Sequence, residues 1–97
     1  MSSSAAAALL AAAARGDNDE VSRLHAEGVD VNAHDDDDSF GRTPVFMAAA
    51  NGQAECIQLL RELGADINKC ATDGASPVYL AAWQGHVACI RALGADI

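Results

Sequence analysis

A repeat of 33 residues is the feature that most constrains what this chain of 97 residues can fold into. When residues 41–57 are laid over residues 74–90, eight of the 17 aligned pairs are identical and four more exchange similar residues. Fixed periods of this length are typical of proteins that stack one supersecondary unit on another, in which no unit buries its apolar face alone. We therefore expect a short stack of repeats, not a single bulky core.

The repeat has a weaker copy upstream and loses three residues near its end. Residues 63–67 match residues 93–97 at an offset of 30, and residues 28–32 match residues 64–68 at an offset of 36. The three extra residues of the upstream copy fall in the acidic run 35–38. The sequence thus predicts one domain over residues 1–97, made of a degenerate unit at 1–40, a full unit at 41–73 and a shortened unit at 74–97.

The two later units each carry the signals of two short helices. Thr43 and Ser76 each precede a proline, and a hydroxyl at the N-cap followed by proline at the first helical position is a frequent helix start. Apolar residues then recur at i, i+3 and i+4. Gly52 and Gly85 are expected to end these first helices in a left-handed conformation. A second helix follows in each unit, and Asp73-Gly74 predicts a turn between the units.

These tracts resemble the ankyrin repeat. The resemblance rests on residues 41–49, on Gly52, on Leu59-Leu60 and on residues 64–68, and it extends over roughly residues 5–97. It implies an all-α repeat stack of helix-turn-helix units, L-shaped in section, with β-turn fingers that protrude between the helix pairs. It also implies that the concave face, formed by the fingers and the first helix of each unit, binds protein partners.

The chain departs from the family pattern at two aromatic residues and in its last helix. Phe46 and Tyr79 stand where the family usually has histidine, so the usual Thr–His hydrogen bonding is missing and aromatic packing is expected to replace it. The last second helix, at roughly residues 86–93, is expected to be one turn shorter than its counterpart, which should make that end of the stack its weakest part. His86 is expected to order the turn between the two helices.

The charge balance excludes several classes of partner. The formal net charge of −8 is unsuited to binding a nucleic-acid backbone or an anionic membrane. The longest apolar run, at residues 5–14, is about half as long as a membrane-spanning helix. An alanine-rich capping helix that begins at a serine N-cap is the favoured interpretation of this run. The alternative, a secretory leader, lacks the positively charged segment that should precede the apolar run.

No pattern in the sequence indicates catalysis or a bound cofactor. A phosphate-binding glycine loop, a nucleophile elbow and an HExxH motif are all absent. The acidic run 35–38 beside His34 raises a metal hypothesis, but consecutive aspartates lack the alternating ligands of a calcium loop. A solvated insertion is the favoured interpretation of the run. In a third interpretation, the negative charge of the run attracts a basic partner and speeds its association.

The three cysteines include no CxxC pair, which favours a reducing, intracellular setting, most simply the cytoplasm. Cys56 and Cys89 occupy equivalent positions on neighbouring second helices, and packed helices lie about 10 Å apart. A disulfide requires Cα atoms within about 7 Å, so we expect two buried free thiols. Cys70 lies in a finger and is expected to be the more reactive thiol.

The resemblance places partner-binding residues beside the turn glycines and at the ends of the first helices. These residues are Phe40, Arg42, Asn51, Asp73, Trp83 and Gln84. Trp83 is the strongest candidate because its equivalents are Ala14 and Ala50, so the fold does not need bulk there. Tryptophan is also strongly enriched at binding hot spots. The alternative is that Trp83 covers the junction between neighbouring helices or packs on a further repeat.

The sequence therefore predicts a non-catalytic protein-interaction module, a scaffold or adaptor without cofactor or metal. Its partner is expected to carry a basic patch that faces the acidic run 35–38. The alternative function is that of structural spacer repeats, a fragment of a longer array with the binding surface elsewhere. The last unit lacks a polar outer face, so self-association through that flank is also expected if the chain exists alone.

Overall fold

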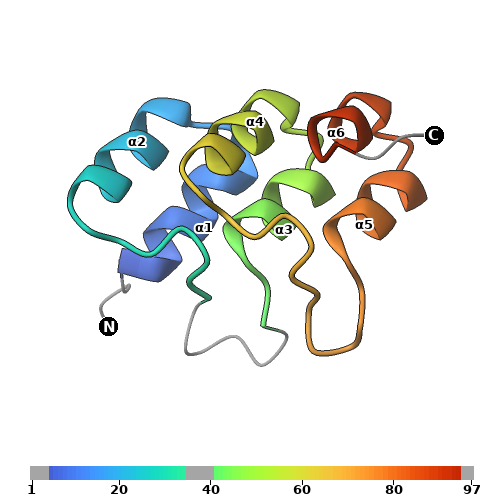
Figure 1. The fold of residues 1–97 in the computed structure, drawn as a ribbon, viewed down its shortest axis with the longest axis horizontal. Helices are drawn as coiled ribbons and strands as arrows, with labels where there is room; N and C mark the ends of the chain where they lie inside the picture. The colour runs from blue at the N-terminus through green and yellow to red at the C-terminus, as the bar shows by residue number, and fades with distance from the viewer. Residues whose placement is uncertain (1–4, 35–40, 95–97) are drawn as a thin grey trace.

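The computed structural model describes residues 5–34 and 41–94, and these residues form six α-helices in antiparallel pairs (Figure 1). The pairs α1–α2, α3–α4 and α5–α6 form the first, the middle and the last unit. The bounds of the helices are α1 Ala5–Arg15, α2 Asn18–Ala26, α3 Pro44–Ala50, α4 Ala54–Glu62, α5 Pro77–Trp83 and α6 Val87–Ala92. The units stack into a body of 40 × 27 × 19 Å, which confirms the predicted all-α repeat stack.

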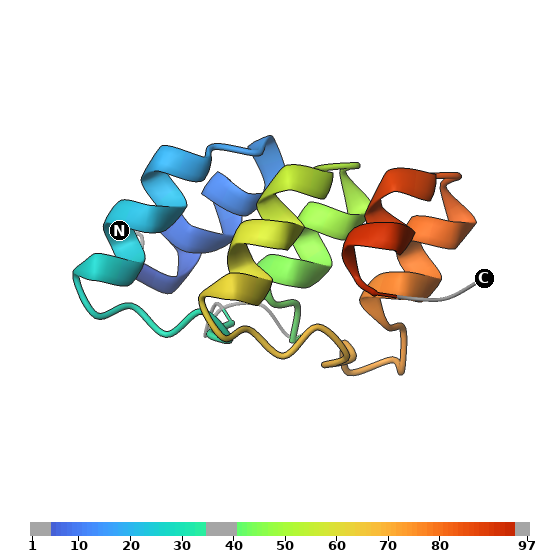
Figure 2. The same cartoon turned by 45° about the horizontal axis from the view of Figure 1, so that its top comes forward.

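The helices form two layers, as Figure 2 shows. The first-helix layer consists of α1, α3 and α5, with α3 packed against both of the others, and the second-helix layer consists of α2, α4 and α6. The segments that connect one unit to the next leave the helices on one side (Figure 1). The segment between α4 and α5, called the second finger, is wholly described. Part of the preceding finger, at residues 35–40, lies outside the described residues.

The predicted helix starts and stops are confirmed by the hydrogen bonds at the helix ends. The Thr43 hydroxyl accepts the backbone N–H of Phe46 at 3.2 Å, and the Ser76 hydroxyl accepts that of Tyr79 at 3.1 Å. Gly52, with φ of +75°, follows α3 and lets the chain reverse into α4. The serine N-cap expected for α1 lies outside the described residues.

Buried alanines allow the first helices to approach one another closely. The fully buried alanines of this layer are Ala12, Ala13, Ala48, Ala49 and Ala81. The larger core side chains come from both layers, and the largest fully buried ones are Leu9, Val21, Val45, Ile57 and Leu60. Because the apolar residues of each unit are covered by the neighbouring unit, the stack and not the unit is the folding entity.

The last unit differs from the middle unit in length and in burial. Helix α6 has six residues where α4 has nine, so the expected loss of about one turn is confirmed. The expectation of aromatic packing holds for Phe46, which is 7% exposed, but is wrong for Tyr79, which is 56% exposed. The two residues differ because their helices have different neighbours. Helix α3 lies between two first helices, α1 and α5, whereas the only first helix that α5 packs on in the described residues is α3.

His86 closes the turn between α5 and α6 through its backbone only, since its side chain makes no capping hydrogen bond and instead contacts the middle unit. Its backbone N–H donates to the carbonyl of Ala81 at 2.8 Å, which closes the turn. Its imidazole lies so close to Gly52 that a Cβ on that glycine would come within 3.1 Å of the ring. Glycine is therefore required at residue 52 both for the positive φ and for the approach of the neighbouring unit.

Candidate partner-binding surface

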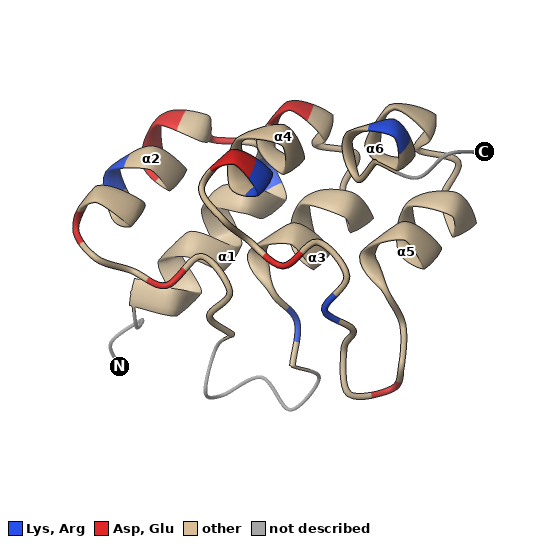
Figure 3. Cartoon of the chain, viewed as in Figure 1, with Lys and Arg blue, Asp and Glu red and all other residues tan. Residues whose placement is uncertain are grey.

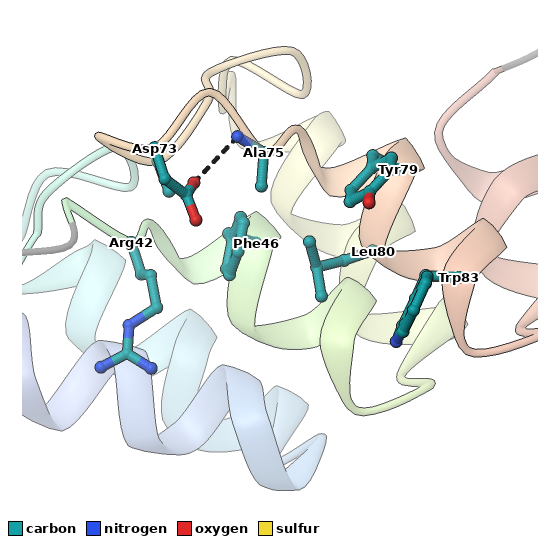
Figure 4. A pocket seen from close by; sticks show the side chains of 8 residues that line it. Arg42, Phe46, Asp73, Ala75, Tyr79, Leu80 and Trp83 are labelled. Carbon is teal, nitrogen blue, oxygen red and sulfur yellow. Dashed lines mark hydrogen bonds between the residues drawn. The ribbon is translucent and has the colours of Figure 1, made fainter.

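The candidate site lies where the second finger meets the first-helix layer. It is an open pocket of about 330 Å³. Two of its residues come from the start of the middle unit, three from the second finger and three from α5. The lining residues are Arg42, Phe46, Ala71, Asp73, Ala75, Tyr79, Leu80 and Trp83. Figure 4 shows that their side chains border one space between the finger and the helices.

The second finger is held in shape by three hydrogen bonds around its tip. The N–H of Ala71 donates to the carbonyl of Ala75 at 2.8 Å, and the N–H of Gly74 donates to that of Ala71 at 2.9 Å. Asp73 Oδ1 accepts the N–H of Ala75 at 2.9 Å. Gly74 has a φ of +87°, which glycine adopts without strain. The finger therefore holds the Asp73 carboxylate in a fixed position at the edge of the pocket.

Trp83 ends α5 and is 74% exposed. Its equivalents, Ala14 and Ala50, are half-buried, although each of their units has a following unit stacked on it. This position therefore stays partly open in a stacked unit, and a large side chain placed there extends away from the stacking interface. The exposure of Trp83 thus has a different cause from that of Tyr79, whose equivalent Phe46 is buried.

The structure brings some of the sequence-predicted binding residues together and separates others. Arg42, Asp73 and Trp83 line the same pocket. Asn51 is exposed and caps its own helix, since its Nδ2 donates to the carbonyl of Met47 at 2.8 Å. Gln84 is exposed at the end of α5 and is not among the residues of the pocket. Phe40 lies outside the described residues, as does the acidic run 35–38.

The large apolar and aromatic lining residues that sequence reasoning missed are Phe46, Tyr79 and Leu80. Tyr79 and Leu80 precede Trp83 by four and three residues, a spacing that places all three side chains on one face of a helix. The signal was therefore present in the sequence once Trp83 had been singled out. Phe46 is largely buried and reaches the pocket from the neighbouring unit, which helical spacing alone does not reveal.

The ionisable groups with displaced pKa values lie away from this pocket. Burial raises the pKa of the Cys56 thiol to about 11, with a contribution from the negative charge of Asp17. Burial also raises the pKa of Cys89. On the exposed face of α2, the hydrogen bonds from Arg23, at 2.8 and 2.7 Å, lower the pKa of Glu20. These shifts reflect the packing of the stack and a surface ion pair.

Cys56 and Cys89 are buried free thiols, and Cys70 is exposed in the second finger. Its thiol is 3.6 Å from the carbonyl oxygen of Asn68. Within residues 5–34 and 41–94, no group of three or more His, Cys, Asp or Glu side chains is arranged to hold a metal ion. In the same residues, no helix has the length and apolar character needed to cross a membrane.

Comparison with known proteins agrees with this architecture. Residues 9–97 match the family model described as ankyrin repeats, in three copies. Among curated proteins, the chain is similar to the ankyrin repeat domain-containing protein 37 of Xenopus tropicalis, with 45% identity over 47 residues. That match covers 48% of this chain and 27% of the relative, so the chain corresponds to little more than a quarter of the relative's length.

Proposed function

The chain belongs to the ankyrin repeat family, and from this premise we propose that it is a non-catalytic scaffold or adaptor that binds a protein partner on its concave face. Ankyrin repeats are generally protein–protein interaction modules and typically have no catalytic role. The concave face proposed here is formed by α3, α5 and the second finger. The charge of −8 supports a partner with basic residues on the surface that it presents.

The observation that carries this proposal is the position of Trp83. It is the only tryptophan of the chain, it is 74% exposed, and it lines a pocket together with a fixed carboxylate. Trp83 shares this pocket with the exposed Tyr79, and adjoining exposed apolar side chains mark interaction surfaces more often than single ones do. Large aromatic side chains in partly enclosed pockets are also the residues most often dominant at protein interfaces.

The arrangement supports binding by a preformed surface. Phe46 is anchored in the stack, the second finger is closed by its own hydrogen bonds, and α5 begins at a capped and proline-fixed residue. Few backbone or side-chain degrees of freedom remain to be lost when a partner binds. The partner would therefore meet a rigid groove whose Trp83 is the largest exposed contact.

The test compares three baits in affinity capture from a lysate of the source cells: the parent chain, Trp83→Ala and Val87→Ala. Val87 is the matched control because it is 54% exposed and does not line the pocket. We expect the parent and Val87→Ala to retain a common set of proteins. The amount of these proteins retained by Trp83→Ala should be lower by about tenfold or more, which is roughly the effect of removing one hot-spot residue. Retention of the same proteins by all three baits would place the binding surface elsewhere.

A second candidate function, that of spacer repeats or a self-associating unit, is favoured by the outer side of the last unit. There Tyr79, Ala82 and Val87 are exposed, whereas Ala49, the equivalent of Ala82, is fully buried. This side has the apolar character of a stacking interface, suited to a further repeat or to a second copy of the chain. Sedimentation of the parent and of Val87→Glu over a range of concentrations tests it. A parent that stays monomeric at all concentrations would contradict self-association.

We also propose an intracellular location. The support is the chemistry of the cysteines, since Cys56, Cys70 and Cys89 are all free and free thiols persist in reducing compartments. Labelling of the thiols in intact cells before lysis tests the proposal. Cys70 should be recovered as a thiol, and its recovery as a mixed disulfide would contradict it.

A further inference from the structure

The pocket beneath the second finger has two chemically distinct parts. Six of its eight lining residues are apolar or aromatic, and they form its floor: Phe46, Ala71, Ala75, Tyr79, Leu80 and Trp83. Its charged residues are Asp73 and Arg42. A volume of about 330 Å³ is at the lower end of the range for ligand pockets, about 300–1,000 Å³. It therefore suits a few side chains of a peptide segment.

The carboxylate of Asp73 is the charged group that faces an occupant. Oδ1 is fixed by the N–H of Ala75, and a carboxylate can accept several hydrogen bonds beyond that one. In Figure 4 the carboxylate is directed toward the side of the pocket on which Phe46 stands. The Arg42 guanidinium is directed away from the Asp73 carboxylate. The edge of the pocket beside the aromatic floor is therefore acidic.

The aromatic rings favour the same sign of charge. Trp83 and Tyr79 are both exposed, and the face of an aromatic ring attracts a cation, tryptophan most strongly. A lysine or arginine can lay its aliphatic stem on such rings while its charged end reaches a carboxylate. Helices α3 and α5 contain no charged residue, and Figure 3 shows them without Lys, Arg, Asp or Glu along their length. Helices α3 and α5 therefore place no cation of their own beside Trp83, and Arg42, which precedes α3, is the one cation among the residues that line the pocket.

We propose that this pocket binds a segment of the protein partner in which a lysine or arginine stands next to an apolar residue. Because Phe46 and Leu80 stand between Asp73 and Trp83 in Figure 4, the basic side chain places its charge at Asp73 with its stem over Phe46, and the apolar side chain packs on Leu80 and Trp83. This inference rests on the proposed function and adds to it the chemistry of the docking segment. It places the cation at the pocket and not at the acidic run 35–38.

The same observations argue against a second copy of the chain as the occupant of this pocket. The pocket spans residues of two units that are already stacked on each other, so a further unit would cover Tyr79 at one edge of the pocket and would not fill the pocket. Trp83 stands at a position that stays partly open in stacked units, as Ala14 and Ala50 show. The net charge of −8 also disfavours close approach of a second identical chain and favours a basic segment.

The experiment is selection of short random peptides, displayed on phage, against the full chain, with Trp83→Ala as the counter-selecting bait. We expect enriched peptides to share a lysine or arginine adjacent to an apolar residue. The affinity of one enriched peptide is then measured by fluorescence anisotropy. Replacing its basic residue by norleucine, which keeps the aliphatic stem and removes the charge, should weaken binding about fivefold to tenfold.

Two matched variants isolate the role of Asp73. Asp73→Asn keeps Oδ1 as an acceptor for the N–H of Ala75, so the finger is preserved while the charge is lost. Asp66→Asn changes the net charge equally and preserves the same kind of bond, since Asp66 Oδ1 accepts the N–H of Asn68 at 3.0 Å, but Asp66 does not line the pocket. We expect Asp73→Asn to weaken the peptide about threefold to fivefold and Asp66→Asn to weaken it less than about twofold.

The outcomes separate this inference from the proposed function. Enriched peptides that lack a basic residue, yet lose binding to Trp83→Ala, would overturn the proposed cation and leave the binding surface standing. If Asp73→Asn and Asp66→Asn weaken the binding of the peptide equally, the peptide is attracted by the net charge of the chain and not by Asp73. That result would overturn the proposed role of Asp73. If the parent enriches no peptide over Trp83→Ala, both the docking segment and the proposed binding surface are wrong.

Discussion

Thr43 and Ser76 cap equivalent helices in different surroundings. Each hydroxyl accepts the backbone N–H three residues on, at 3.2 and 3.1 Å. Thr43 is 1% exposed, whereas Ser76 is half-buried near the open side of the last unit. Removal of the Thr43 hydroxyl leaves an N–H away from water without a partner, while water can replace the Ser76 hydroxyl.

We therefore expect Thr43→Ala to lower the free energy of unfolding by about 1–2 kcal/mol and Ser76→Ala by about 0.5–1 kcal/mol. Urea unfolding followed by far-UV circular dichroism measures both. Ser22→Ala is the control, because Ser22 is exposed in the interior of α2 and its loss should be neutral or slightly stabilising. Equal losses for Thr43→Ala and Ser76→Ala would contradict the argument from burial.

The Cys56 thiol makes the stability of the stack depend on alkaline pH. Its pKa is raised from 9.0 to about 11 by burial, so the folded state disfavours the thiolate. The stabilising contribution is complete below pH 9, where the unfolded chain also holds the proton, and is lost as the pH rises through about 11. We expect this loss to amount to about 1–2 kcal/mol.

Urea unfolding of the parent and of Cys56→Ala under reducing conditions, between pH 7 and about pH 11, tests this expectation. At pH 7 the variant should be less stable by about 1 kcal/mol because it loses buried apolar contacts. The difference should shrink as the pH rises, since only the parent loses the thiol contribution. Cys70→Ala, which removes an exposed thiol, is the control. A difference that stays constant over this range would refute the prediction.

At the scale of single elements, the shortened helix α6 is completed by a residue of the middle unit. Arg61 Nη1 donates to the carbonyl of Ala92, the last residue of α6, at 3.3 Å. Its guanidinium lies so close to Gly94 that a Cβ there would come within 3.1 Å of it. A cation at the carboxyl end of a helix is favourable because the last carbonyl groups carry partial negative charge.

Arg61→Gln should therefore lower the free energy of unfolding by about 0.5–1 kcal/mol and speed amide hydrogen exchange in α6 more than in α4. Arg91→Gln is the matched control because Arg91 is exposed in the last turn of α6 itself and loses the same charge. We expect Arg91→Gln to change stability by less than about 0.5 kcal/mol. Indistinguishable effects of the two substitutions would mean that the charge alone matters and the bond to Ala92 does not.

The helices were predictable because their signals are local, whereas the contacts between units were not. Thr43 and Gly52 mark the ends of α3 through hydrogen bonds and φ angles set within a few residues. The exposure of Tyr79 was missed because the repeat assigns equivalent residues equal burial, while burial depends on which neighbour is present. The bond between Arg61 and Ala92 joins residues 31 apart, and no pattern in the sequence indicates it.

The candidate site was predictable to the same limited degree. The resemblance to the family pointed to the positions of Asp73 and Trp83, and the large side chain of Trp83 made it the stronger candidate. Both residues line the pocket. Phe46 was expected to pack inside the stack and Leu80 was not singled out, because both lie in apolar tracts of the kind that also describe buried helix faces. Asn51 is exposed, and its amide donates to a carbonyl of its own helix, a local bond that spacing does not reveal; its contact with a partner stays a prediction.

At the scale of the whole molecule, each unit is stabilised by its neighbours. Gln53 Nε2 donates to the carbonyl of Ala14 at 3.2 Å, and the N–H of Asp66 donates to Asn32 Oδ1 at 2.6 Å, so hydrogen bonds join the middle unit to the first. Helix α3 packs between α1 and α5. The stability of such a stack is the sum of unit terms and neighbour terms. The middle unit should therefore be the most stable and the last unit the least.

This gradient predicts that the backbone amides of α5 and α6 exchange hydrogen faster than those of α3 and α4, by opening that does not require global unfolding. Fusion of one polar capping repeat after residue 97 should slow exchange in α5 and α6 and raise the urea midpoint, because Tyr79, Ala82 and Val87 would then be covered. A glycine-serine tail of equal length is the control and should change neither. Equal protection of all helices in the parent would instead describe a fully cooperative stack, in which the exposed outer side of the last unit costs no local stability.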